Sequence, residues 1–183
     1  MIPQTLNALN QKKTILYPTD TVWGIGGDAT VREVVQKIYT LKEREDHKAL
    51  IVLVDSKEML LKYIDEFPDA ANTLIESDRP TTVIYPKGIG FAQNLFGTDQ
   101  SIGIRISKNE FCQKLIQKFG KPIISTSANK SGSPTPKHYK EIEKTILDGV
   151  DYIVPLKEEN STNSPPSRVI KILPDGELEI LRP

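Results

Sequence analysis

Serine, threonine and asparagine side chains gather directly after one predicted strand of this 183-residue chain, in Ser125-Thr126-Ser127-Ala128-Asn129. Hydroxyl and amide groups at the carboxyl end of a strand in an open α/β sheet commonly bind phosphate or ribose. The alternative is a turn in which these side chains cap their own backbone. The sequence contains neither the lysine-bearing phosphate loop G-x-x-x-x-G-K-[ST] nor the nucleophile elbow G-x-S-x-G, so neither chemistry is predicted.

Two basic residues, Lys42 and Arg44, end a segment from Val31 to Arg44 in which apolar residues recur at helical spacing. On a continuing helix, residues two apart point to different sides. If the helix ends near Lys42, both cations can approach one anion from a loop. A solvated basic helix end that complements the helix dipole is the alternative, and composition alone favours it.

Arg105 belongs to a predicted strand whose three isoleucines share one face, which leaves Ser101, Gly103 and Arg105 on the other. An arginine beside a glycine on a strand can bind a carboxylate or a phosphate through two hydrogen bonds. An exposed arginine on an edge strand fits the pattern equally well.

The glycine-rich segment 17–29 formally matches the dinucleotide fingerprint G-x-G-x-x-G/A. In that motif the glycines follow the strand directly, whereas Gly24 lies well beyond Tyr17, where the predicted strand ends. We therefore predict a loop that lines a pocket, with Thr19 and Thr21 offering hydroxyl groups.

The remaining composition excludes several classes of protein. With 24 Lys+Arg against 24 Asp+Glu, the chain is not a histone-like basic protein. Cys112 is the single cysteine and lies in an apolar helix stripe, so it is predicted to be core, and no Cys/His cluster has zinc spacing. The longest apolar run, 49–54, is too short for a membrane span, and no signal peptide precedes the first strand. We expect a cytosolic protein without a membrane segment.

Strands and helices alternate along the chain, which predicts one α/β domain over residues 1–183. Capping boxes predict helix starts at Asp55 and Ser107, Pro68 suits the first turn of another helix, and Gly120 ends a helix. The predicted strands are 14–17, 49–54, 81–85, 101–106, 122–125, 151–154, 168–173 and 177–181; the predicted helices are 31–44, 55–64, one from residue 68, 107–119 and 139–149. The last two strands form a hairpin, so the sheet is mixed.

Together these segments resemble the YrdC-like family of threonylcarbamoyl-AMP synthases, from about Thr14 to Arg182. The resemblance rests on five motifs in order: 17–24, the K-x-R pair of Lys42 and Arg44, 101–105, the S-x-N pair within 125–132, and 180–182. It implies the short form of the family, with a twisted, mixed, open α/β sheet of YrdC-like fold.

The resemblance also implies a reaction in which L-threonine, bicarbonate or CO2, and ATP with Mg²⁺ form threonylcarbamoyl-AMP and pyrophosphate. The product would pass to the tRNA threonylcarbamoyltransferase complex for N6-threonylcarbamoyladenosine at tRNA position 37, and contact with tRNA or double-stranded RNA is possible. Position by position, the residues expected around L-threonine are Thr19, Arg105, Ser125 and Ser167; those expected around ATP are Lys42, Arg44, Ser101, Ser127, Asn129, Thr135 and Arg182. The catalytic set expected among them is Lys42, Arg44, Ser127 and Asn129.

This chemistry needs positioned cations and hydrogen-bond donors more than a protein nucleophile, which suits a chain without a triad. It also needs water excluded, so we expect the segment 156–167, which lacks a core pattern, to be a lid. The chain departs from the family pattern at Ala49, Leu53, Thr81 and Arg168.

Two alternatives remain open. One is a non-catalytic RNA-binding module on the same fold, although zero net charge argues against strong sequence-independent RNA binding. The other is a paralogous ATP-dependent carbamoyl or nucleotidyl transferase that uses a different amine.

Overall fold

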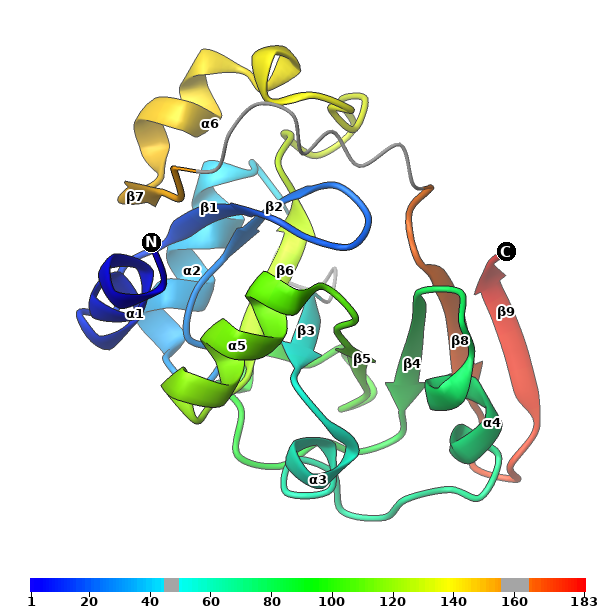
Figure 1. Cartoon of the computed structure of the whole chain (residues 1–183). Coiled ribbons are helices and arrows are strands. Elements are labelled where there is room, and N and C mark those ends of the chain that lie inside the picture. The colour runs from blue at the N-terminus through cyan, green and yellow to red at the C-terminus, as the bar shows by residue number, and fades with distance from the viewer. Residues whose placement is uncertain (45–49, 156–164) are drawn as a thin grey trace.

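A mixed β-sheet forms the centre of the computed structural model, which describes residues 1–44, 50–155 and 165–183 (Figure 1). Within the described residues, nine strands form one sheet in the order β7-β1-β2-β6-β3-β5-β4-β8-β9. The strands are β1 (Ile15–Pro18), β2 (Trp23–Gly26), β3 (Ile51–Val54), β4 (Thr81–Tyr85), β5 (Ile102–Ile106), β6 (Ile123–Ser127), β7 (Tyr152–Ile153), β8 (Arg168–Ile172) and β9 (Leu178–Arg182).

The helices pack around this sheet (Figure 1). They are α1 (Ile2–Asn10), α2 (Arg32–Leu41), α3 (Lys57–Leu60), α4 (Ala71–Glu76), α5 (Glu110–Phe119) and α6 (Lys144–Gly149), with 3-10 turns η1 (Gln93–Leu95) and η2 (Tyr139–Glu141). In the part of the chain that the structure describes, no helix is long and apolar enough to cross a membrane.

Strand pairing explains why the sheet is mixed. The pairs β1–β7, β3–β5 and β4–β8 are parallel, and the other neighbours are antiparallel. The hairpin β8–β9 and the mixed α/β sheet are therefore confirmed. The central strand β3 brings β6 and β5 to its two sides, although these strands lie far from it along the chain.

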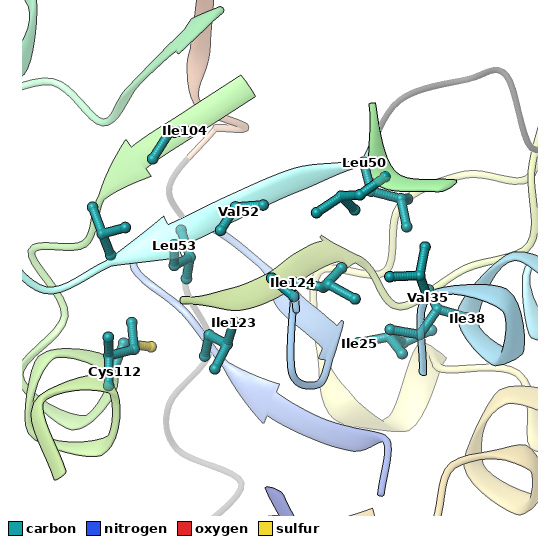
Figure 2. Close-up of a cluster of buried hydrophobic side chains, with 14 of the residues drawn as sticks. Ile25, Val35, Ile38, Leu50, Val52, Leu53, Ile104, Cys112, Ile123 and Ile124 are labelled. Carbon is teal, nitrogen blue, oxygen red and sulfur yellow. The ribbon is translucent and has the colours of Figure 1, made fainter. Parts of the chain in front are cut away.

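Helices cover both faces of the sheet and bury its apolar side chains. Figure 2 shows Cys112 of α5 beside Leu53 and Ile123, whereas Val35 and Ile38 of α2 gather around Ile25 and Ile124. Adjacent residues on a strand point to opposite faces, so α5 and α2 pack on opposite sides of β6. Cys112 is fully buried, as predicted for a core residue.

Several predicted elements begin or end elsewhere. Ser56 and Asn109, rather than Asp55 and Ser107, cap α3 and α5, because their side chains accept the capping hydrogen bonds from Met59 N and Cys112 N. The helix predicted over 55–64 ends at residue 60, the one predicted near residue 68 begins at 71, and the one over 139–149 is a 3-10 turn followed by α6. The predicted stop at Gly120 is confirmed by its left-handed φ of 73°.

One α-helix and one strand were not predicted at all. α1 precedes the first predicted strand. The segment 23–26, predicted to be a loop, is the strand β2, which is fully buried between β1 and β6. Glycines are depleted in strands, so the sequence Trp23-Gly24-Ile25-Gly26 does not read as one. Here they permit close approach of neighbouring groups.

Gly26 shows this close approach, and replacing it by alanine is expected to destabilise the fold. An added Cβ would lie 2.3 Å from the Ile124 carbonyl oxygen and 2.6 Å from a ring carbon of Tyr17. Overpacking of this kind costs about 1–3 kcal/mol of unfolding free energy, measurable by urea denaturation. The control is Gly120→Ala, where nothing lies within 4 Å and only the positive φ opposes the change. A loss at Gly26 no larger than at Gly120 would contradict the packing argument.

Candidate active site

A cavity of about 330 Å³ opens on one face of the sheet. Segments from the whole length of the chain contribute to its lining, from the turn before β2 to the end of β9. The lining residues are Thr19, Thr21, Val22, Gly24, Arg44, Leu50, Ile51, Ile84, Ser101, Gly103, Arg105, Ser125, Thr126, Ser127, Thr135, Pro166, Ser167, Val169 and Arg182.

The floor of the cavity is a row of paired residues across four strands. Ser125 pairs with Ile51, Ile51 with Gly103, and Gly103 with Ile84. Side chains of directly paired residues point to the same face. Ser101, Gly103 and Arg105 all line the cavity, as the alternation along this strand predicted. β5 is an inner strand, so Arg105 is not an edge residue.

Arg105 is buried and pairs with the largely buried carboxylate of Asp20. Its side chain is 2% exposed, and its Nη2 group donates to Asp20 Oδ1 at 2.9 Å. Asp20 lies in the turn between β1 and β2, and its side chain is 10% exposed. The ion pair with Asp20 therefore orients the Arg105 guanidinium, which lies at the wall of the cavity.

The turn that carries Asp20 is held by the hydroxyl of Thr19. Thr19 Oγ1 donates to Val22 O at 2.8 Å and accepts from the Thr21 and Val22 backbone N–H groups. Thr19 therefore lines the cavity while its hydroxyl fixes the β1–β2 turn.

Ser167 and Arg182 contact each other at the opposite side of the cavity. Arg182 Nε donates to Ser167 O at 2.7 Å and its Nη2 to Ser167 Oγ at 3.1 Å. Ser167 Oγ also lies 2.9 Å from the buried Thr82 hydroxyl. These bonds join the end of β9 to the residue that precedes β8. Burial and the nearby charge of Arg105 lower the pKa of Arg182.

The side chain of Ser101 is held by a hydrogen bond to the carboxylate of Asp99. Its hydroxyl donates to Asp99 Oδ1 at 2.6 Å, and Lys171 Nζ lies 2.6 Å from Asp99 Oδ2. The hydrogen bonds from Lys171 and Ser101 hold the pKa of Asp99 well below its usual range. Asp99 therefore remains an ionised acceptor, and the Ser101 hydroxyl hydrogen points toward it.

Lys42 lies beneath the cavity rather than in its lining. α2 ends at Leu41, and the Lys42 side chain, 2% exposed as a residue, donates to Ser127 O and Asn129 O at 2.5 Å each. Burial, and secondarily the charge of Arg44, lowers the pKa of Lys42 to about 7. Lys42 thus holds the backbone of the S-x-N turn.

Asn129 also acts within this turn. Its Nδ2 group donates to Ser133 O at 2.6 Å and to Lys130 O at 3.1 Å, and it is not among the lining residues. Its Oδ1 is buried without a hydrogen-bond partner. Arg44, by contrast, lines the cavity, and burial lowers its pKa.

The structure thus brings nine of the eleven expected site residues to one cavity. Those nine are Thr19, Arg44, Ser101, Arg105, Ser125, Ser127, Thr135, Ser167 and Arg182. Sequence reasoning missed the apolar lining residues Leu50, Ile51, Ile84 and Val169, and it missed Asp20. Strand alternation indicates Ile51, Ile84 and Val169 once the sheet order is known, but not Leu50, which directly precedes Ile51. Asp20 lies within the motif 17–24, but nothing in the sequence indicates that it pairs with Arg105. Most of the expected lid, residues 156–164, lies outside the described residues, as does Ala49.

No group of three or more His, Cys, Asp or Glu side chains that could hold a metal ion occurs within residues 1–44, 50–155 and 165–183. The described lining of the cavity contains arginines and hydroxyl groups but no carboxylate. The site is therefore suited to anionic groups.

Comparison with protein families and curated proteins gives a consistent match. The Sua5/YciO/YrdC family model, described as "Telomere recombination", matches residues 7–183. A Vibrio parahaemolyticus protein named threonylcarbamoyl-AMP synthase is 37% identical over 170 residues, covering 91% of each chain. A Pseudoalteromonas translucida protein of the same name is 31% identical over 172 residues, covering 92% of this chain and 91% of the other.

Solved structures agree with this match. The crystal structure of P. abyssi Sua5 complexed with L-threonine has a TM-score of 0.89 at 27% identity and is covered over 53% of its length by all of this chain. This chain therefore spans about half of that protein. E. coli YciO has a TM-score of 0.84 at 24% identity, with 99% of this chain and 87% of YciO covered, which shows the shared fold.

Proposed function

The chain belongs to the Sua5/YciO/YrdC family, and from this we propose that it is a threonylcarbamoyl-AMP synthase. It joins L-threonine, bicarbonate or CO2, and ATP into threonylcarbamoyl-AMP and pyrophosphate. Relatives with this name at 31–37% identity over most of the chain support the assignment. The Sua5 structure with L-threonine supports the amino-acid substrate.

The observation that carries the proposal is the convergence of Arg44, Arg105 and Arg182 on one cavity rich in serine and threonine hydroxyls. Three guanidinium groups suit a carboxylate together with a triphosphate. L-threonine and ATP supply these anions.

The reaction has two bond-forming steps. The amino group of L-threonine takes up CO2 and loses a proton, which gives an N-carboxylate. An oxygen of this carboxylate attacks the α-phosphorus of ATP, the bond to the β-phosphate oxygen breaks, and pyrophosphate leaves. Negative charge grows on the phosphate oxygens, so preorganised cations and donors lower the barrier without a protein nucleophile.

We assign the residues to the two substrates as the family resemblance implies, and their convergence on one cavity supports the assignment. Arg105 receives the L-threonine carboxylate, with Thr19, Ser125 and Ser167 around the amino acid. Arg44 and Arg182 face the phosphates, with Ser101, Ser127 and Thr135 around the nucleotide. Lys42 and Asn129 do not line the cavity; they hold the turn that presents Ser127 to the nucleotide.

Mg²⁺ enters as part of the MgATP substrate. The described lining offers no carboxylate to the ion, so the phosphates and water are its ligands in this proposal. Its chemistry is to neutralise the charge of the departing pyrophosphate.

We further propose that the enzyme works in the cytoplasm, where ATP, L-threonine and tRNA are found together. Its mixed anhydride product passes to the tRNA threonylcarbamoyltransferase complex, because such anhydrides decompose in water. Contact with tRNA belongs to the same proposal.

The decisive experiment measures pyrophosphate release from MgATP and bicarbonate, with and without L-threonine, and looks for threonylcarbamoyl-AMP by mass spectrometry. Release that requires both L-threonine and bicarbonate, with the adduct present, is expected. A folded protein that binds ATP without release points to a paralogous transferase for another amine. A protein that binds duplex RNA but no ATP points to an RNA-binding module.

A further inference from the structure

The largely buried carboxylate of Asp20 has no part in the reaction described above, although it pairs with Arg105, which lines the cavity. Asp20 is held in the β1–β2 turn and ion-pairs with Arg105. It is not a lining residue, so it does not reach a bound substrate.

The geometry of the pair determines which part of the guanidinium is left for a ligand. Arg105 Nη2 donates to Asp20 Oδ1 at 2.9 Å. Arg105 Nε and Asp20 Oδ2 are both buried without a hydrogen-bond partner. The pair is therefore joined by the single Nη2–Oδ1 hydrogen bond, and the buried Nε group is not available to a ligand. Of the three guanidinium nitrogens, Nη2 is bonded to Asp20 and Nε is buried, so Nη1 is the one left for a ligand in the cavity that Arg105 lines.

The surroundings of the ion pair admit little water. The side chains of Tyr17 and Cys112 lie close enough to Arg105 and Asp20 to interact electrostatically with both. Burial raises the pKa of the Cys112 thiol to about 12. Water therefore screens the pair poorly. The Thr19 hydroxyl fixes the backbone turn on the other side of Asp20.

We propose that Asp20 is a positioning residue that sets the affinity for L-threonine by fixing the Arg105 guanidinium with Nη1 toward the substrate carboxylate. This inference rests on the proposed function. It makes Asp20 a determinant of amino-acid recognition and leaves ATP recognition to residues elsewhere in the cavity.

The test compares Asp20→Asn with Asp28→Asn. Asp28 is a matched control because its side chain is 3% exposed and it also forms a 2.9 Å ion pair, with Lys121, away from the cavity lining. Asp20→Asn is expected to raise the KM for L-threonine roughly 10- to 100-fold, with the KM for ATP changed less than about twofold. Asp28→Asn should change neither KM by more than about twofold.

A second readout uses L-threoninol, which lacks the carboxylate. The preference of the enzyme for L-threonine over L-threoninol should shrink in Asp20→Asn and persist in Asp28→Asn, because only the former loses the oriented guanidinium. If Asp20→Asn does not fold, Asp20→Glu keeps the charge, moves the carboxylate by one methylene, and should also raise the KM for L-threonine.

Binding of L-threonine, measured by calorimetry, distinguishes a failure of the proposed function from a failure of the role inferred for Asp20. Wild-type protein that binds no L-threonine overturns the proposed function and this inference with it. Wild-type binding with equal binding by folded Asp20→Asn overturns the inference alone. Equal increases in the KM for ATP and for L-threonine, or the same increases in Asp28→Asn, also overturn it.

Discussion

Replacing Lys42 with methionine is expected to reduce threonylcarbamoyl-AMP formation by at least about 100-fold. The ammonium group donates to the carbonyl oxygens of Ser127 and Asn129, and methionine has a similar length but no donor. The S-x-N turn then loses both of its hydrogen bonds to the Lys42 side chain and is held against the end of α2 by the backbone bond from Ser131 N to Lys42 O. Displacement of the Ser127 side chain from the nucleotide follows, and small displacements of positioning groups have large effects on rate.

The same change should also lower stability. Two buried carbonyl oxygens lose a charged donor, which costs about 1–3 kcal/mol of unfolding free energy. The matched control is Lys130→Met, in the same turn, where the ammonium forms an exposed ion pair with Glu43. Pyrophosphate release and urea denaturation of both variants measure the two effects. Near-normal activity of Lys42→Met would show that the buried ammonium does not position the site.

The charge of Lys42 can be tested by pH without a mutation. Its pKa is lowered to about 7, mainly by burial, so the ammonium is lost as pH rises through that value. A neutral amine keeps N–H donors for the two carbonyl oxygens, but the positive charge next to the proposed nucleotide site is lost, and with it the long-range attraction for phosphate. ATP affinity of the wild-type protein is therefore expected to fall between pH 6 and 8.5, measured by direct binding. Constant affinity over this range would contradict a role for the charge.

Arg105→Met is expected to abolish the use of L-threonine and to destabilise the protein. The substitution removes the cation of a pair whose side chains are 2% and 10% exposed and leaves the Asp20 carboxylate without a partner. Breaking a buried pair in this way costs about 3–5 kcal/mol. The loss of the guanidinium should lower kcat/KM for L-threonine by more than about 100-fold.

A double variant separates these two effects. Arg105→Met combined with Asp20→Leu removes both charges, and an apolar replacement of a buried pair is often neutral in stability. The double variant should therefore regain most of the unfolding free energy while L-threonine use stays lost. Recovery of activity together with stability would mean that Arg105 acts only in folding.

The sequence by itself determined which side chains share a face and where most strands lie. Strict alternation placed Ser101, Gly103 and Arg105 on one side of β5, because successive side chains on a strand point to opposite faces. The apolar strand segments and the left-handed stop at Gly120 were equally local properties. Such features depend on a few neighbouring residues, so pattern alone identifies them.

The helix caps and the strand β2 were harder to predict from the sequence. Several adjacent residues can each cap a helix, and the choice of Ser56 over Asp55 depends on the path of the chain into α3. β2 contains two glycines and is a strand because β1 and β6 pair with its two edges. Tertiary pairing outweighs local preference here.

The tertiary structure alone decided what each site residue contacts. Lys42 and the S-x-N turn form one unit only because β6 passes the end of α2. Asp20 meets Arg105 only because the β1–β2 turn extends to the Arg105 side chain, although β6 and β3 lie between β2 and β5 in the sheet. These contacts join residues 85 positions apart in each case. Spacing in the sequence cannot specify such distances, since they follow from the order of strands in the sheet, which long-range packing fixes.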